Sequence, residues 1–147
     1  MAKAVLLAAA AALVSSSAVA QTTHQDWVSY SKDGRCWAAT LPTSSSEGIG
    51  GREGPYLSIT NYPAEGVRGS VAVVAGFDVT KGKAQLSVDG KDFEALPYGE
   101  AAFVASGSPE AALVAAMRSG RELKVAWSDA DGNAAVDSYS LIGFTAA

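Results

Sequence analysis

The amino-acid sequence predicts a mainly β fold: an antiparallel β-sandwich or curled barrel of about eight or nine strands, with one short helix from Pro109 to Ser119. Two observations carry this prediction. Short runs rich in β-branched and aromatic residues are separated by frequent glycines, prolines and polar turn residues. One stretch has apolar residues at helical spacing between a helix start signal and a helix stop signal.

The strand-forming segments follow one another at short intervals along the chain. They are residues 26–31, 35–40, 56–61, 70–77, 84–88, 91–96, 101–105, 122–128 and 136–142. Residues 41–55 are rich in serine, glycine and proline and are predicted to form a long exposed loop. The glycine-rich run at 48–54 departs from both phosphate-binding fingerprints, so we expect it to be flexible, as loops that carry binding residues often are.

The best-defined turn is Asp89-Gly90, a pair that favours a type I′ hairpin because both positions must tolerate a positive φ. A two-residue turn also sets the register of the flanking runs: Val88 with Lys91, Leu86 with Phe93, and Ala84 with Ala95. This register gathers apolar side chains on one face and polar side chains on the other, in agreement with the turn.

Residues 70–77 are apolar on both faces, which predicts a central strand covered on both sides. In residues 122–128, alternate side chains should point inward: Leu123, Val125 and Trp127. The register of the hairpin that follows stays open. A two-residue turn at Asp131-Gly132 would set Trp127 against Val136 but Val125 against Ser138.

The helix prediction depends on its end signals and one apolar stripe. Ser108 is a good N-cap, Pro109 suits the first helical position, and Glu110 complements the positive helix end. Arg118 and Gly120 mark the other end. Four residues form the stripe that should face the core: Ala112, Leu113, Ala116 and Met117.

The first twenty residues are predicted to be a cleaved secretion signal. Lys3 supplies a positive charge, residues 4–14 are an apolar run, and Ala18-Val19-Ala20 is the small-x-small pattern that a signal peptidase recognises. The run is too short to cross a ~30 Å hydrocarbon core as a helix, and Gln21 after the cut excludes a lipid-bearing cysteine there. We expect residues 21–147 to form one domain that is periplasmic or secreted, with an outer-envelope association left open.

The composition limits the partners. The chain has 15 acidic and 11 basic residues without a Lys/Arg cluster, which argues against nucleic acid and anionic lipid. No second stretch has membrane-spanning length, so we expect no membrane span in the mature chain. Cys36 is the one cysteine and has no internal disulfide partner. A buried thiol is expected, and a bridge to a second copy or another protein is the alternative; the oligomeric state is undetermined.

Residues that carry chemistry are scarce, and we predict no catalytic, cofactor-binding or metal-binding residue. His24 is the one histidine, and it follows the predicted cleavage site closely, where termini are usually mobile. Ser29 and Lys32 have S-x-x-K spacing, but strand residues three apart face opposite ways and the companion motifs are missing. The Asp-x-Asp-x-Asn run at 129–133 begins like a calcium loop, without the loop's glycine and final glutamate.

The aromatic residues leave carbohydrate binding open, because rings on a surface stack against sugars. The candidates are Trp27, Trp37, Tyr62 and Tyr98. Buried side chains would belong to the core, whereas side chains gathered on a surface would form a platform.

Several blocks of sequence follow one another in an order and at a spacing typical of one family. They are Cys36-Trp37-Ala38, residues 56–67 (YLSITNYPAEGV), Gly76-Phe77, Val88-Asp89-Gly90-Lys91, residues 115–120 (AAMRSG) and residues 137–147 (DSYSLIGFTAA). Over residues 27–147 the chain resembles the invasion-associated locus B family of exported bacterial proteins. The resemblance implies a periplasmic or envelope-associated β-sandwich protein with no established enzymatic activity. Many relatives carry a further cysteine pair in the stretch corresponding to residues 98–108, which this chain lacks.

We therefore predict a non-enzymatic exported envelope or periplasmic protein that needs no cofactor. It is expected to act through protein or cell-surface binding, in host interaction or envelope stress, with a partner that the sequence does not define. A carbohydrate-binding β-sandwich module for envelope or host glycans is the alternative. A hydrolase would require unrelated polar residues to converge on a pocket.

Overall fold

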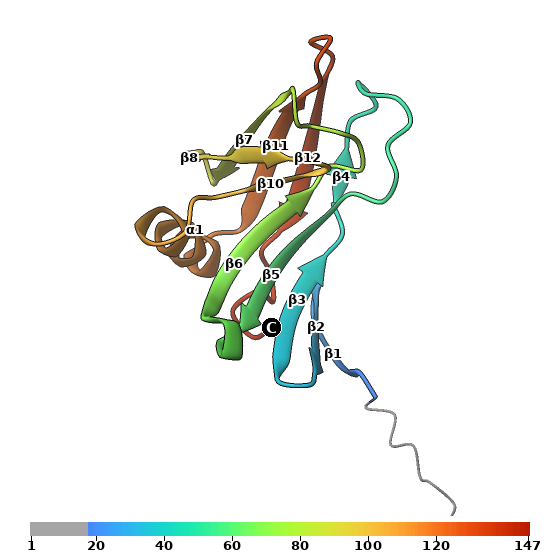
Figure 1. Ribbon diagram of the computed structural model, residues 1–147. Helices are drawn as coiled ribbons and strands as arrows, with labels where there is room; N and C mark the ends of the chain where they lie inside the picture. The colour runs from blue at the N-terminus through green and yellow to red at the C-terminus, as the bar shows by residue number, and fades with distance from the viewer. Residues whose placement is uncertain (1–17) are drawn as a thin grey trace, which may run out of the picture.

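The structure, a computed structural model, describes residues 18–147, whose strands form two antiparallel sheets (Figure 1). The larger sheet has the order β1-β2-β3-β5-β6-β10-β9, and the smaller has the order β4-β12-β11-β7-β8. The strands of the larger sheet are β1 (Ala20–His24), β2 (Trp27–Lys32), β3 (Arg35–Thr40), β5 (Tyr56–Tyr62), β6 (Val67–Val74), β9 (Leu96–Tyr98) and β10 (Ala101–Phe103). Those of the smaller sheet are β4 (Ser44–Ser45), β7 (Lys83–Val88), β8 (Lys91–Glu94), β11 (Glu122–Ser128) and β12 (Ala134–Ser140). A 3-10 turn (Pro63–Glu65) precedes β6, and helix α1 spans Ser108–Ser119.

The predicted β-sandwich is confirmed, and within the described residues the sheets do not close into a barrel. The strands outnumber the prediction because β1 and β4 are polar edge strands, which lack the apolar alternation that marks a strand in a sequence. The predicted strand 91–96 is also divided. Its first part, β8, pairs with β7, whereas β9 pairs with β10 in the other sheet. The chain crosses between the sheets at Ala95, which is small and buried.

The β7–β8 hairpin has the predicted turn and register. Asp89 and Gly90 have φ values of 46° and 85°, as a type I′ turn requires. The first two predicted apolar-face pairs, Val88 with Lys91 and Leu86 with Phe93, are present. The ladder ends at the pair Gln85–Glu94, so the third predicted pair lies beyond it.

Strand β6 occupies a central place between β5 and β10, but only one of its faces is fully covered. Val71 and Val73 are buried against the core, whereas Ala72 and Val74 are half-buried on the other side of the sheet. The strand also ends at Val74 and not at residue 77. The prediction of a strand covered on both sides is therefore wrong for the second face.

The β11–β12 hairpin resolves the register that the sequence leaves open. Trp127 pairs with Ala135 and Val125 with Asp137, one position away from the register of a two-residue turn. The connection is a longer loop, in which Asp129 Oδ1 accepts the N–H groups of residues 131 and 133 at 3.0 and 2.8 Å. Leu123, Val125 and Trp127 point inward and are buried, as predicted.

Helix α1 contacts β6 and β7, one strand from each sheet, and closes one side of the sandwich (Figure 1). Its N-cap is Gly107, and the Ser108 side chain makes no capping hydrogen bond, in contrast to the prediction. Leu113 and Met117 are buried as predicted, but Ala112 is exposed. The buried face of the helix includes Glu110. The β6–β10 pairing ends at Ala72, and the next N–H of β6, that of Val71, donates to Glu110 Oε1 at 3.1 Å.

The segment 41–55 is the long, mostly exposed loop that the sequence predicts, but it is anchored to the smaller sheet at two points. β4 pairs with β12 along its edge, and Ile49 is buried. A Cβ atom on Gly48 would collide with the carbonyl oxygen of Ala134, so glycine is required by this close approach.

A buried ion pair fixes the end of the same segment. The Arg52 side chain is 8% exposed and forms a bidentate pair with the fully buried carboxylate of Asp137, with 2.9 Å between Nη1 and Oδ1. Arg52 Nε donates to the carbonyl of Ala75 at 3.0 Å, and Trp127 Nε1 donates to Asp137 Oδ2 at 2.8 Å. The guanidinium lies 5.7 Å from the ring centroid of Phe77. Partners on three sides therefore compensate the desolvation of both charges.

The ion pair predicts a large difference between two arginine variants. Arg52→Ala should lower the free energy of unfolding by about 3–5 kcal/mol, because it leaves the Asp137 carboxylate buried without its cation. Arg35→Ala removes an exposed pair with Glu65, whose side chains are 56% and 53% exposed, and should cost less than about 1 kcal/mol. Urea denaturation followed by circular dichroism measures both, and equal losses would contradict a structural role for the buried pair.

The orientation of α1 predicts a second contrast. Leu113→Asp should lower the free energy of unfolding by roughly 3 kcal/mol or more, because it places an unpaired carboxylate in the core. Ala112→Asp, one residue away on the exposed side of the helix, should change it by less than about 1 kcal/mol. Thermal and urea denaturation of both variants test the contrast. Unchanged stability of Leu113→Asp would show that the helix is not docked as described.

Candidate functional site

The pair closest to a catalytic arrangement is His24 and Ser29, on neighbouring strands β1 and β2. His24 Nε2 lies 2.8 Å from Ser29 Oγ, and the histidine is half-buried in a strand, not in a loose terminus as expected. A catalytic base of this kind is itself oriented by a third group. Within residues 18–147, no carboxylate forms a hydrogen bond with His24. The observed geometry is that of a polar contact between the two strands.

The other short motifs have structural positions. Ser29 lies on the side of the sheet that faces the sandwich interior, and Lys32 lies on the opposite side, so the S-x-x-K pair does not converge. In the run at 129–133, hydrogen bonds with Asn133 lower the pKa of Asp129, which shapes the hairpin loop. Among residues 18–147, no group of three His, Cys, Asp or Glu side chains is placed to hold a metal ion.

The four candidate aromatics do not form one platform. Trp27 is fully buried and donates its indole N–H to the carbonyl of Ser140 at 2.9 Å. Trp37 and Tyr62 are half-buried, and Tyr98 is 77% exposed near the far edge of the larger sheet. Trp27 and Trp37 face opposite sides because they occupy positions of opposite parity in the β2–β3 register.

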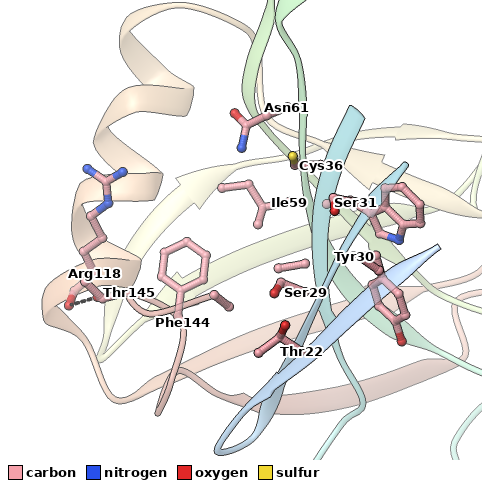
Figure 2. A pocket seen from close by; sticks show the side chains of 14 residues that line it. Thr22, Ser29, Tyr30, Ser31, Cys36, Ile59, Asn61, Arg118, Phe144 and Thr145 are labelled. Atoms are coloured by element: carbon pink, nitrogen blue, oxygen red, sulfur yellow. Dashed lines mark hydrogen bonds between the residues drawn. The ribbon is translucent and has the colours of Figure 1, made fainter. Parts of the chain in front are cut away.

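A pocket of about 350 Å³ (Figure 2) opens at the end of the sandwich where the larger sheet extends past the smaller one (Figure 1). Its floor is the inward side of β1, β2, β3 and β5, where small polar side chains predominate. Its walls are the end of α1 and the C-terminal segment. The floor contains Thr22, Ser29, Ser31, Cys36, Ile59 and Asn61, and the walls contain Arg118, Phe144 and Thr145.

The side chains that line this pocket are mixed in character. Figure 2 shows Ile59 and Phe144 facing each other across the hollow, with Arg118 on the helix beside them. Asn61 Oδ1 accepts the N–H of Gly69 at 2.8 Å, which leaves the amide nitrogen of Asn61 free to donate. Arg118 forms no ion pair within residues 18–147. The pocket thus combines an apolar surface with unused hydrogen-bond donors.

Cys36 lies at the start of β3 and lines the pocket. Its side chain is exposed, so the expectation of a buried thiol is wrong. The reason is that the smaller sheet does not cover this end of the inward face, although Ala38, two residues further along β3, is buried. A bridge between chains stays a prediction.

The opposite side of the larger sheet forms a second candidate surface, which we call the outer face. It is formed by side chains that point away from the smaller sheet, and its central and far-edge part consists of Val28, Tyr30, Trp37, Ala39, Tyr56, Ser58, Thr60, Ser70, Ala72, Val74, Leu96, Tyr98, Ala101 and Phe103. Tyr30 and Trp37 are stacked, with centroids 5.4 Å apart and an interplanar angle of 12°. A hollow of about 490 Å³ lies between Tyr30 and Tyr56.

Sequence reasoning missed both surfaces. The alternation of side chains along β2 and β3 could have predicted the outer face. Val28 and Tyr30 point to the same side of β2, and they pair with Ala39 and Trp37 on β3. The pocket has no comparable signal, because it depends on the unequal extent of the two sheets. Arg118 is visible in the sequence only as a residue typical of a helix end.

The comparisons with known proteins agree with the fold. The crystal structure of invasion associated protein b from Bartonella henselae matches with a TM-score of 0.57 and 18% sequence identity, over 87% of this chain and 92% of that chain. No curated protein matches. None of the helices in residues 18–147 is long and apolar enough to cross a bilayer. A family model described as invasion associated locus B (IalB) protein matches residues 21–147. The resemblance of the sequence blocks is therefore confirmed, and the chain belongs to the invasion associated locus B family.

Proposed function

We propose that this protein is a non-catalytic, exported envelope protein that binds a protein partner through the outer face of its larger sheet. Its proposed mature form is a single domain that starts at Gln21, after removal of the signal segment. The family match over residues 21–147 begins at the same residue, which supports this boundary. The first 17 residues of the predicted signal lie outside the described residues.

The observation that carries the proposal is the uncovered state of the outer face. The second sheet and α1 both lie on the inward side of the larger sheet, so no described element covers its outer side (Figure 1). Apolar side chains remain accessible there: Tyr56 is 39% exposed, Phe103 37% and Leu96 49%. Contiguous exposed apolar surface of this kind marks interaction sites on proteins.

The composition of the outer face favours a protein partner. Its centre carries aromatic and aliphatic side chains without a charged residue, as the cores of protein interfaces do. The charged residues lie at one end, where Arg35 pairs with Glu65 at 2.7 Å and stacks on Tyr62 with 4.9 Å to the ring centroid. A partner can therefore dock without desolvating an ion pair.

Site-specific photo-crosslinking in intact cells tests the proposal. A photoreactive residue at Thr60, which lies next to Trp37 on the outer face, should capture one specific protein in the compartment to which the chain is exported. The same residue at Glu94, on an exposed position of β8 in the smaller sheet, is the matched control and should not capture it. Identical products from both positions, or abundant bystander proteins alone, would count against the proposal.

Glycan binding is the second candidate function, because the stacked Tyr30–Trp37 pair offers aromatic surface to a sugar ring. Trp37 is the informative reporter: of the three tryptophans, Trp27 and Trp127 are 0% and 2% exposed. A bound glycan should change the tryptophan fluorescence of the wild-type protein and leave that of Trp37→Phe unchanged. A flat titration across a broad glycan panel would reject this candidate.

A further inference from the structure

We propose that the pocket between the larger sheet, the end of α1 and the C-terminal segment binds a small ligand that carries a carboxylate beside an apolar group. This site is separate from the outer face, because the two surfaces lie on opposite sides of β2, β3 and β5. Tyr30 and Trp37 also border the pocket, but their side chains have the opposite parity in the β2–β3 register to Ser29, which faces the pocket with Ile59 (Figure 2).

The depth of the pocket comes from the residues on its floor. A sheet face inside a sandwich is normally filled by large side chains that interdigitate with the second sheet. Here the floor holds Thr22, Ser29 and Ser31, which are too short to fill the space that the smaller sheet leaves open. Its volume of about 350 Å³ falls in the range of small-molecule sites.

The one charged side chain of the lining favours an anionic ligand. The chain has more acidic than basic residues, yet no aspartate or glutamate side chain lines this pocket. Arg118 supplies its one charged side chain and forms no ion pair within residues 18–147, including with the main-chain carboxylate of Ala147, which also lines the pocket. A guanidinium presents paired N–H groups that match a carboxylate in a bidentate geometry.

The donors and the apolar surface line the same hollow. Asn61 lines both this pocket and a neighbouring hollow of about 420 Å³, together with Ile59 and Arg118. That neighbouring hollow is also lined by a second arginine, Arg68, and by Glu110, whose carboxylate accepts the N–H of Val71. A carboxylate held by Arg118 and the Asn61 amide would place its attached group against Ile59 and Phe144, where burial of apolar surface adds to the affinity.

Two sources share this chemistry: a free organic acid with an aliphatic tail, and the C-terminal carboxylate of a peptide with an apolar last residue. Hexanoate represents the first and the tripeptide Ala-Ala-Leu the second. Hexanol and the amidated tripeptide lack the carboxylate and are their matched controls. Binding of only one acid identifies its source, and either result supports the carboxylate site.

The test is isothermal titration calorimetry with these four probes, on the wild-type protein and two variants. Arg118→Gln should weaken binding of the carboxylate probes about tenfold, because it removes a charge-assisted hydrogen bond. Arg121→Gln changes an exposed arginine outside the pocket and should leave affinity unchanged. Equal binding by the controls without a carboxylate, or an equal effect of both variants, would overturn the proposal. So would the absence of binding by every probe.

Methyl-resolved NMR gives a readout that does not depend on affinity alone. Saturating hexanoate or Ala-Ala-Leu should shift the methyl signals of Ile59, on the pocket floor, and leave those of Val28, on the outer face, in place. Shifts at Val28 alone would place the ligand on the outer face and refute the pocket. Because the crosslinking experiment probes the outer face, the proposed function and this inference can fail independently.

Discussion

The buried pair of Arg52 and Asp137 is the constraint on which the arrangement of the sandwich depends. Asp137 faces the interior only in the register that opposes it to Val125, and a slip of one residue would turn its side chain outward. Arg52 reaches it only if the segment 41–55 follows the edge of the smaller sheet. The pair thus couples a hairpin register to the path of a distant segment. Tyr139 belongs to the same interior: burial, together with the Asp137 charge, raises the pKa of its hydroxyl, so it stays neutral beside the pair.

Local patterns predicted the parts of the fold that local interactions determine. Asp89 and Gly90 tolerate positive φ, and the alternation of the flanking residues agrees with their turn, so type and register both follow from the sequence. The β11–β12 hairpin differs because Asp129 uses its side chain to satisfy backbone N–H groups and thereby lengthens the loop. Glu110 shows the same limit. Its position suggests a contribution to the helix dipole, but its partner is a backbone N–H of β6, distant in sequence.

The candidate surfaces were less predictable than the fold, for a related reason. The number of aromatic residues does not tell which side of a strand each one occupies. Trp27 and Trp37 lie on opposite sides of the larger sheet, and this follows only from the β2–β3 register. The pocket arises where the seven-stranded sheet extends beyond the five-stranded sheet. This difference in extent depends on both sheets, so no single segment of the sequence predicts it. Cys36 was expected to be buried because apolar strand residues usually are, and it is exposed because it occupies this uncovered end.

The two surfaces share the same strands, and this limits how they can influence each other. Along β2, Ser29 faces the pocket and Tyr30 the outer face, so the sheet itself separates the two sites and neither ligand occludes the other. A ligand in the pocket would change outer-face affinity only by altering the position of the backbone between them. The β2–β3–β5 ladder is continuous through this region and resists such a shift. Simultaneous and largely independent occupancy is therefore the expected behaviour, because coupling requires two arrangements of the sheet that the ligands distinguish.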